Sequence, residues 1–170
     1  IHTHESLLYG GWNTEVAHEL TPDDNSLCVL PLCHINAQVV SVMGTLVNGS
    51  RLVMPQRFQA SKFWSWVVDQ KCTWFSAVPT ILSYLMNIEE GVNIKSKLGR
   101  VRFGRSASAA LPPALHKAFE ERFGIKIVET MGITETASPL LSNPIDPKLH
   151  KLGSPGIAYG NEVRIADADG

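Results

Sequence analysis

The chain has 170 residues, of which 44% are hydrophobic and 18% charged, and this composition is typical of a folded globular domain and excludes a disordered segment. The 15 basic residues nearly balance the 16 acidic ones, and a net charge of -1 excludes a general electrostatic attraction to nucleic acid. The longest apolar-leaning stretch, residues 37–47, is too short for a membrane span, so we expect no transmembrane segment.

The ends and the cysteines bear on the context of the chain. It opens at Ile1 without an initiator methionine and stops at Gly170 inside a turn-like sequence, so we expect an internal segment of a longer protein. Cys28, Cys33 and Cys72 are odd in number, have no paired spacing and lie in apolar surroundings, which argues against a disulfide framework or a zinc site. We expect buried, reduced thiols and therefore a cytoplasmic protein.

Short apolar runs alternate with helix-like stretches along the chain, which predicts an α/β fold: a mostly parallel sheet flanked by helices on both faces. The expected strands are residues 27–30, 51–54, 73–77, 101–104 and 125–129. The expected helices are residues 36–48, 61–71, 79–86 and 112–123.

Several residues indicate where these elements begin and end. Ser61 is the expected N-cap of its helix, Pro79 suits a first helical turn, and Gly124 predicts a left-handed helix end. Residues 89–98 are expected to form a loop. Residues 161–166 alternate like a strand of a following, smaller β layer.

In sheets of this kind, ligands bind beyond the carboxyl ends of the strands. The first segment at such a place, residues 31–36, puts the His34 imidazole at the rim of a strand end, where it can face a carboxylate or wall off an acyl pocket. A purely structural histidine at a helix start explains the same pattern. The second segment, residues 104–112, has very small side chains that would let a flat ring approach, although close packing of a helix on the sheet accounts for it about as well.

The third segment, residues 129–136, sets the Thr134 hydroxyl beside the Glu135 carboxylate, a pair suited to a phosphate oxygen and its Mg²⁺. A helix-capping arrangement would use the same residue types. The fourth segment, residues 151–156, is a glycine-rich turn that can approach a phosphate or a thioester through its backbone, and an ordinary surface loop is the alternative.

In this order, the four segments resemble the core motifs of the adenylate-forming superfamily, which includes acyl-CoA synthetases, luciferases and peptide-synthetase adenylation domains. Residues 31–34 resemble its Pro-Leu-x-His element and residues 77–80 its Val-Pro-Thr element. Residues 105–112 resemble the adenine-side Ser-Gly-Gly-Ala-Pro-Leu-Pro element, residues 132–135 the Tyr-Gly-x-Thr-Glu element without its first residue, and residues 151–156 the Lys-x-Gly-Ser-x-Gly element.

The resemblance implies a place in a longer enzyme. Residues 1–160 would belong to the large N-terminal AMP-binding domain, and residues 161–170 would begin a following β subdomain. Residues 2–7 look like the stretch after the family's phosphate loop. That loop, the downstream ribose-binding aspartate and the C-terminal lid are expected outside this chain, so the segment alone is expected to be inactive.

The implied activity is that of an AMP-forming acid:CoA ligase. A carboxylate attacks the α-phosphate of ATP to give an acyl adenylate and pyrophosphate, and the thiol of CoA then attacks the acyl carbon. The resemblance therefore implies ATP, Mg²⁺ and a small carboxylic acid, with CoA as co-substrate and no nucleic acid. Whether the protein forms a homo-oligomer stays open.

The resemblance also implies roles for individual residues. The catalytic set would be Thr134 on phosphate, Glu135 on Mg²⁺, and His34. The nucleotide site would be lined by Ser108, Ala109, Ala110, Glu129, Thr130, Met131 and Gly132. The acid would be bound by His34, Val78, Ser106 and Gly132. Met131 stands where the family usually has an aromatic ring over adenine, and a thioether can still cover a ring face.

The sequence leaves alternatives for the acid that is activated and for the molecule that accepts the acyl group. Residues 33–35 hold no acid to pair with an amino group, which disfavours amino-acid activation because a buried unpaired ammonium is costly. Residues 58–80 and 142–144 look similar to ligases for small acids such as oxalate, while a medium-chain or aromatic acid stays open. An adenylation enzyme that loads a carrier protein, or a non-catalytic interaction module, would share the motifs seen here.

Overall fold

The computed structural model describes residues 1–88, 94–137 and 139–168. Its centre is a seven-stranded sheet in the order β2-β1-β3-β4-β5-β6-β7. The strands are β1 (Asn25–Cys28), β2 (Arg51–Val53), β3 (Trp74–Ala77), β4 (Phe103–Ser106), β5 (Ile127–Met131), β6 (Leu141–Ser142) and β7 (Ile157–Ala158). Strands β1 to β5 are parallel, while β6 and β7 add an antiparallel edge. The predicted fold class, a mostly parallel sheet flanked by helices, is confirmed.

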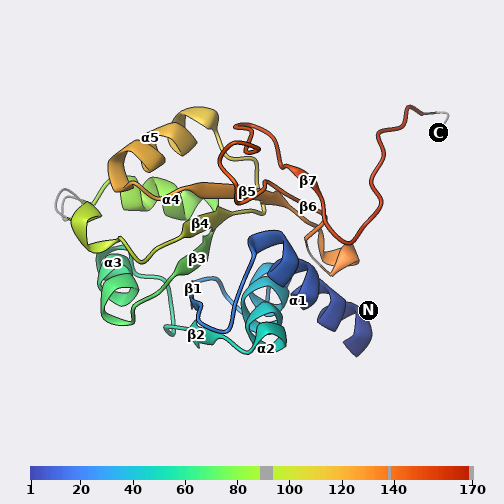
Figure 1. The fold of residues 1–170 in the computed structure, drawn as a ribbon, viewed down its shortest axis with the longest axis horizontal. Helices are drawn as coiled ribbons and strands as arrows, with labels where there is room; N and C mark the ends of the chain where they lie inside the picture. The colour runs from blue at the N-terminus through green and yellow to red at the C-terminus, as the bar shows by residue number, and fades with distance from the viewer. Residues whose placement is uncertain (89–93, 138, 169–170) are drawn as a thin grey trace.

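Helices cover both faces of the sheet (Figure 1). They are α1 (His4–His18), η1 (Asn36–Met43), α2 (Gly44–Asn48), α3 (Ala60–Asp69), α4 (Pro79–Met86), η3 (Lys95–Lys97), α5 (Pro113–Phe123) and η4 (Thr134–Thr136). The larger core joins α3, α4 and α5 to one face, whereas α1 and η1 lie against the other.

Side chains alternate between the two faces of the sheet along each strand, and this alternation explains why the two cores lie on opposite faces. In β3, Trp74 packs toward the η1 side and its neighbour Phe75 toward α3, because successive strand residues point to opposite faces. Gly104 of β4 lies between Phe75 and Ile127, and a Cβ there would overlap the Phe75 ring. The small residue in a core strand therefore makes room for an aromatic side chain.

Most predicted elements are present with ends displaced by one or two residues. The helix predicted at residues 36–48 is helical throughout, although its first part, η1, has π-helical geometry. Gly124 ends α5 in the left-handed region at φ 71°, as predicted. Of the loop predicted at residues 89–98, residues 89–93 lie outside the described part of the chain, and Lys95–Lys97 forms a 3-10 turn.

Three expectations need correction. Ser61 is not an N-cap, because α3 already begins at Ala60 and Gln59 precedes it. Residues 161–166 form no strand in the described structure: they pair with no neighbour, and Ile165 is fully exposed. Cys33 is exposed in the loop after β1, although Cys28 and Cys72 are buried free thiols as predicted.

Helix α1 has no counterpart among the predicted helices. Its sequence includes a pair of glycines and has no apolar stripe, so helical periodicity is absent. A capping box starts it: the Thr3 hydroxyl accepts from the backbone of Ser6, and the Ser6 hydroxyl accepts from the backbone of Thr3. Among the described residues, no helix is long and apolar enough to cross a membrane.

Candidate active site

The segments that follow β1, β3, β4 and β5 meet around a cavity of about 550 Å³. The parallel strands place their carboxyl ends at one edge of the sheet, which brings together residues far apart in the sequence. The cavity is lined by Leu30, Pro31, His34, Ile35, Asn36, Val78, Ser108, Gly132, Ile133, Thr134 and Glu135. Its volume lies within the range of small-molecule sites.

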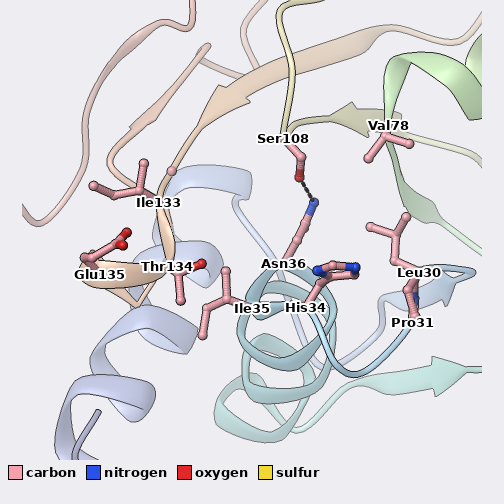
Figure 2. Close-up of a pocket in the computed structure, with 11 residues that line it drawn as sticks. Leu30, Pro31, His34, Ile35, Asn36, Val78, Ser108, Ile133, Thr134 and Glu135 are labelled. Atoms are coloured by element: carbon pink, nitrogen blue, oxygen red, sulfur yellow. Dashed lines mark hydrogen bonds between the residues drawn. The ribbon is translucent and has the colours of Figure 1, made fainter. Parts of the chain in front are cut away.

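The lining residues fall into two groups with a hydrogen-bonded pair between them (Figure 2). Thr134 and Glu135 lie on one side, on the turn that follows β5. His34 lies nearer the other side, where Leu30 and Val78 give an apolar wall. Asn36 lies between them and donates from Nδ2 to the Oγ of Ser108 at 3.2 Å. A ligand that spans the cavity would therefore pass this pair.

A second cavity of about 380 Å³ adjoins the first and shares Ser108 and Gly132 with it. Its wall comprises Ser108, Ala109, Ala110, Glu129, Thr130, Met131, Gly132, Gly153 and Pro155. Small side chains and backbone form much of this wall, so a flat ring can lie close to it. The Oε2 of Glu129 and the Oγ1 of Thr130 are buried and have no hydrogen-bond partner among the described residues. The described residues therefore leave two buried polar atoms unpaired beside this cavity.

The bend between β4 and α5 is fixed at both ends. Ser108 has a left-handed backbone at φ 71°, which is rare for a residue with a side chain, and its hydroxyl is the partner of Asn36. At the other end, the backbone N–H of Leu111 donates to Oε1 of Glu129 at 2.9 Å. The small-residue segment thus has a defined shape, which close packing of a helix alone would not require.

Asn143 organises the glycine-rich turn of residues 151–156. Its Oδ1 accepts from the backbone N–H of Lys151 at 3.0 Å, and its Nδ2 donates to the carbonyl oxygen of Ser154. The turn brings Gly153 and Pro155 to the wall of the second cavity. This organising role has no marker in the sequence, because Asn143 lies in a loop and its amide contacts backbone only.

A buried arginine lies behind the wall of the first cavity. Arg105 of β4 is 1% exposed, and its Nη1 donates to Oδ1 of Asn36 at 2.6 Å and to Oγ of Ser76 at 3.2 Å. Burial lowers the pKa of Arg105 to about 9. Neither Arg105 nor Asn36 is among the sequence-predicted site residues. The predicted strand ends at residue 104, so only the structure places Arg105 inside a buried parallel strand.

The structure places nearly all of the sequence-predicted site residues on these two walls. His34, Val78, Thr134 and Glu135 line the first cavity. Ala109, Ala110, Glu129, Thr130 and Met131 line the second, and Ser108 and Gly132 belong to both. Ser106 lines neither, because it is fully buried within β4. Contact between Ser106 and a substrate therefore has no geometric support.

Comparisons with known proteins give a uniform picture. A family model described as AMP-binding enzyme matches residues 1–170. The chain is 49% identical over 168 residues to the sulfoacetate–CoA ligase of Cupriavidus necator, and this match covers 99% of the chain and 32% of that protein. It is 32% identical over 161 residues to the oxalate–CoA ligase of Arabidopsis thaliana, covering 93% of the chain and 31% of that protein. The chain thus spans about a third of the length of these relatives.

Solved structures agree with the sequence relatives. The fatty acyl CoA synthetase of Mycobacterium tuberculosis superposes with a TM-score of 0.88 at 26% identity, covering 99% of this chain and 33% of that one. MatB of Rhodopseudomonas palustris, solved with ATP bound, superposes with a TM-score of 0.83 at 25% identity, covering 92% of this chain and 30% of that one.

Proposed function

We propose that this chain, which belongs to the AMP-binding enzyme family, is the part of an AMP-forming acid:CoA ligase that holds the acid and the adenine of an acyl adenylate. One observation carries the proposal: the two adjoining cavities share Ser108 and Gly132. An acyl adenylate has an acyl group and a nucleoside joined through one phosphate. A pair of sites that meet at a shared wall suits a ligand of that shape.

In this proposal the second cavity takes the adenine ring. Ala109, Ala110 and Gly132 allow the ring to approach the backbone, and Met131 covers one of its faces. Residues 129 and 130, at the end of β5, complete the wall beside the ring. ATP then enters with its phosphates directed through the junction at Ser108 into the first cavity.

The first cavity takes the phosphates and the acid. Thr134 donates its hydroxyl to a phosphate oxygen, and Glu135 holds Mg²⁺ together with the phosphates of ATP. The described residues contain no group of three or more His, Cys, Asp or Glu side chains that could hold a metal ion. A magnesium ion bound by one carboxylate and substrate phosphates fits this chain, because Mg²⁺ often binds proteins in that way and neutralises phosphate charge when bound.

The acid lies at the His34 end, against Leu30 and Val78. His34 orients the carboxylate toward the α-phosphate and limits the length of the acyl group. Relatives at 49% and 32% identity are named for sulfoacetate and oxalate, and these names support a short acid as the substrate of this protein. The same relatives are named as CoA ligases, which supports CoA as the acceptor of the acyl group.

The proposal extends to domains and compartment. Residues 1–160 belong to the AMP-binding domain, and residues 161–170 begin a β subdomain. The other residues of that subdomain cover Val163 and Ile165, which are exposed in this chain. The free thiols of Cys28 and Cys72 are in keeping with a reducing, cytoplasmic compartment.

The test is the exchange of labelled pyrophosphate into ATP by the full-length protein, with a panel of acids and then with CoA as acceptor. Acid-dependent exchange followed by release of a CoA thioester is the expected result. Exchange without thioester formation would favour a carrier-protein acceptor, and no exchange with any acid would refute the proposed activity.

A further inference from the structure

Arg105 carries a positive charge that nothing in the described chain balances. It is among the largest fully buried side chains, and its bonded partners, Asn36 and Ser76, are neutral. Arg105 takes part in none of the ion pairs found within residues 1–88, 94–137 and 139–168. Its lowered pKa of about 9 still leaves the guanidinium charged at neutral pH. A buried cation without a counter-ion is unfavourable, so its retention calls for a physical reason.

Asn36 transmits this charge to the first cavity. A guanidinium has donors and no acceptor, so the Asn36 oxygen must face Arg105 and its NH₂ group must point the other way. The NH₂ group donates to Ser108, and Asn36 and Ser108 both line the cavity. The amide is therefore held with its positive end toward the cavity, and the contact with Arg105 polarises it further.

The other charged groups of the cavity are distributed unevenly. Among the described residues on its wall, His34 and Glu135 are the ionisable ones. Glu135 lies with Thr134 across the cavity from His34 (Figure 2). The part of the wall formed by His34, Asn36 and Ser108 thus offers hydrogen-bond donors, with a cation behind them and no carboxylate.

We propose that the acid activated by this protein carries a second anionic group, a carboxylate or a sulfonate, and that Asn36 and Ser108 bind this group with Arg105 as the positioning residue behind Asn36. The inference rests on the proposed ligase function and names its substrate class. Because Ser108 lies where the two cavities meet and Asn36 of the first cavity is bonded to it, the second anionic group must be close to the carboxylate that attacks the phosphate. A short diacid meets this requirement, whereas a monocarboxylate with an apolar acyl chain would bring no anionic group of its own to Asn36 and Ser108.

The first test compares acids in the full-length protein with ATP and CoA. Oxalate, malonate and sulfoacetate are each compared with acetate, propionate and butyrate by kcat/KM for CoA thioester formation. The expected result is a preference of about tenfold or more for an acid with two anionic groups. A preference for the monocarboxylates would overturn the inference and leave the ligase function intact. Absence of pyrophosphate exchange with every one of these acids, measured on the same protein, would instead refute the ligase function.

The second test changes residues of the hydrogen-bonded series Arg105–Asn36–Ser108. Asn36→Asp places a carboxylate beside Arg105 and in the wall, so kcat/KM for the preferred diacid should fall by about tenfold or more, mainly through KM. Turnover of a monocarboxylate should fall much less. Arg105→Met should act in the same direction, and Arg105→Lys should restore part of the preference because it keeps the charge.

The matched control is Arg102→Met. Arg102 precedes the same strand, is 34% exposed, and already pairs with Asp24 at 2.6 Å, so its loss should not change the ratio of diacid to monoacid. Circular dichroism identifies any variant that fails to fold, and Asn36→Asp decides the question if Arg105→Met is such a variant. An unchanged ratio in folded Asn36→Asp would overturn the inference.

Discussion

Glu129 accepts a hydrogen bond from the backbone N–H of Leu111, and its Oε1 lies 2.9 Å from that nitrogen. This bond ties the end of β5 to the bend after β4, and residues of both segments line the second cavity. Glu129→Ala removes the acceptor and leaves a buried N–H unpaired, at a cost of about 1–3 kcal/mol. We expect the KM for ATP to rise by roughly fivefold or more in the pyrophosphate exchange assay.

The control for this variant is Glu129→Gln, which keeps an oxygen at the same distance along the side chain. The glutamine variant should therefore retain the shape of the bend, and its KM for ATP should rise less than that of the alanine variant. An alanine variant that binds ATP as the unchanged protein does would show that the Glu129–Leu111 bond does not shape the nucleotide site.

Glu135 is the carboxylate proposed to hold Mg²⁺. If this contact contributes more than about 1.4 kcal/mol in the transition state, Glu135→Ala should reduce acid-dependent exchange by at least about tenfold. Glu135→Gln keeps the size of the side chain and removes its charge, so it should be similarly impaired and should need more Mg²⁺ for half-maximal activity. Unchanged exchange in Glu135→Ala would remove this residue from the mechanism.

Met131 is 46% exposed on the wall of the second cavity, where an aromatic ring would stack better on adenine. Met131→Tyr should lower the KM for ATP by about two- to tenfold, since such ring pairs are worth about 0.5–1.5 kcal/mol. Met54→Tyr, at an equally exposed methionine on neither cavity wall, is the control. A higher KM in Met131→Tyr would place the adenine ring elsewhere.

Sequence periodicity predicts the parallel core of this fold well, because each of the strands β1 to β5 overlaps a short apolar run and helices separate these runs. The same rule explains why the predicted site residues lie together: the residues that follow β4 and β5 must meet at one sheet edge. Thr134 and Ser108 are 26 positions apart in the numbering, yet both line one cavity. The topology accounts for that proximity, and the motifs account for the chemistry.

Interactions made through backbone atoms escape prediction from the sequence. The left-handed conformation of Ser108 and the bonds from Asn143 to the backbone of residues 151 and 154 depend on loop paths that no periodicity encodes. Residues 161–166 show the opposite error: alternation predicts a strand, but a strand needs a partner, and none of the described residues provides one. The Arg105–Asn36 contact joins a strand to a helix and becomes evident only in three dimensions.

Gly156 precedes β7 with φ 95°, and a Cβ there would overlap the backbone carbonyl of Ser142 in β6. Gly156→Ala should therefore force β6 and β7 apart, disturb the turn that lines the second cavity, and cost at least about 2 kcal/mol of stability. Gly99→Ala is the control, because its Cβ would meet no atom within 4 Å. Thermal denaturation of both variants in the full-length protein measures the difference, and equal midpoints would contradict the close approach of Gly156 to Ser142.

His18 should make the fold sensitive to acid. Its ring is fully buried, stacks on Trp74 and Phe103, and has Nδ1 2.8 Å from the carbonyl oxygen of Thr14. Burial, and secondarily the charge of Arg105, lowers the pKa of His18 from 6.5 to about 3. Below pH 6.5 the unfolded chain therefore binds a proton that the folded chain does not, so stability falls as the pH drops toward 3.

Replacing His18 with phenylalanine tests this linkage, because a phenyl ring can still stack on Trp74 and cannot titrate. Between pH 6 and pH 4, the slope of stability against pH should be shallower in His18→Phe by up to about 1.4 kcal/mol per pH unit. Denaturation midpoints of the full-length protein across that range give the slope. His4→Phe, at an exposed histidine of the same helix, is the control for the loss of one imidazole. Parallel slopes for His18→Phe and the unchanged protein would mean that His18 takes up its proton in the folded state.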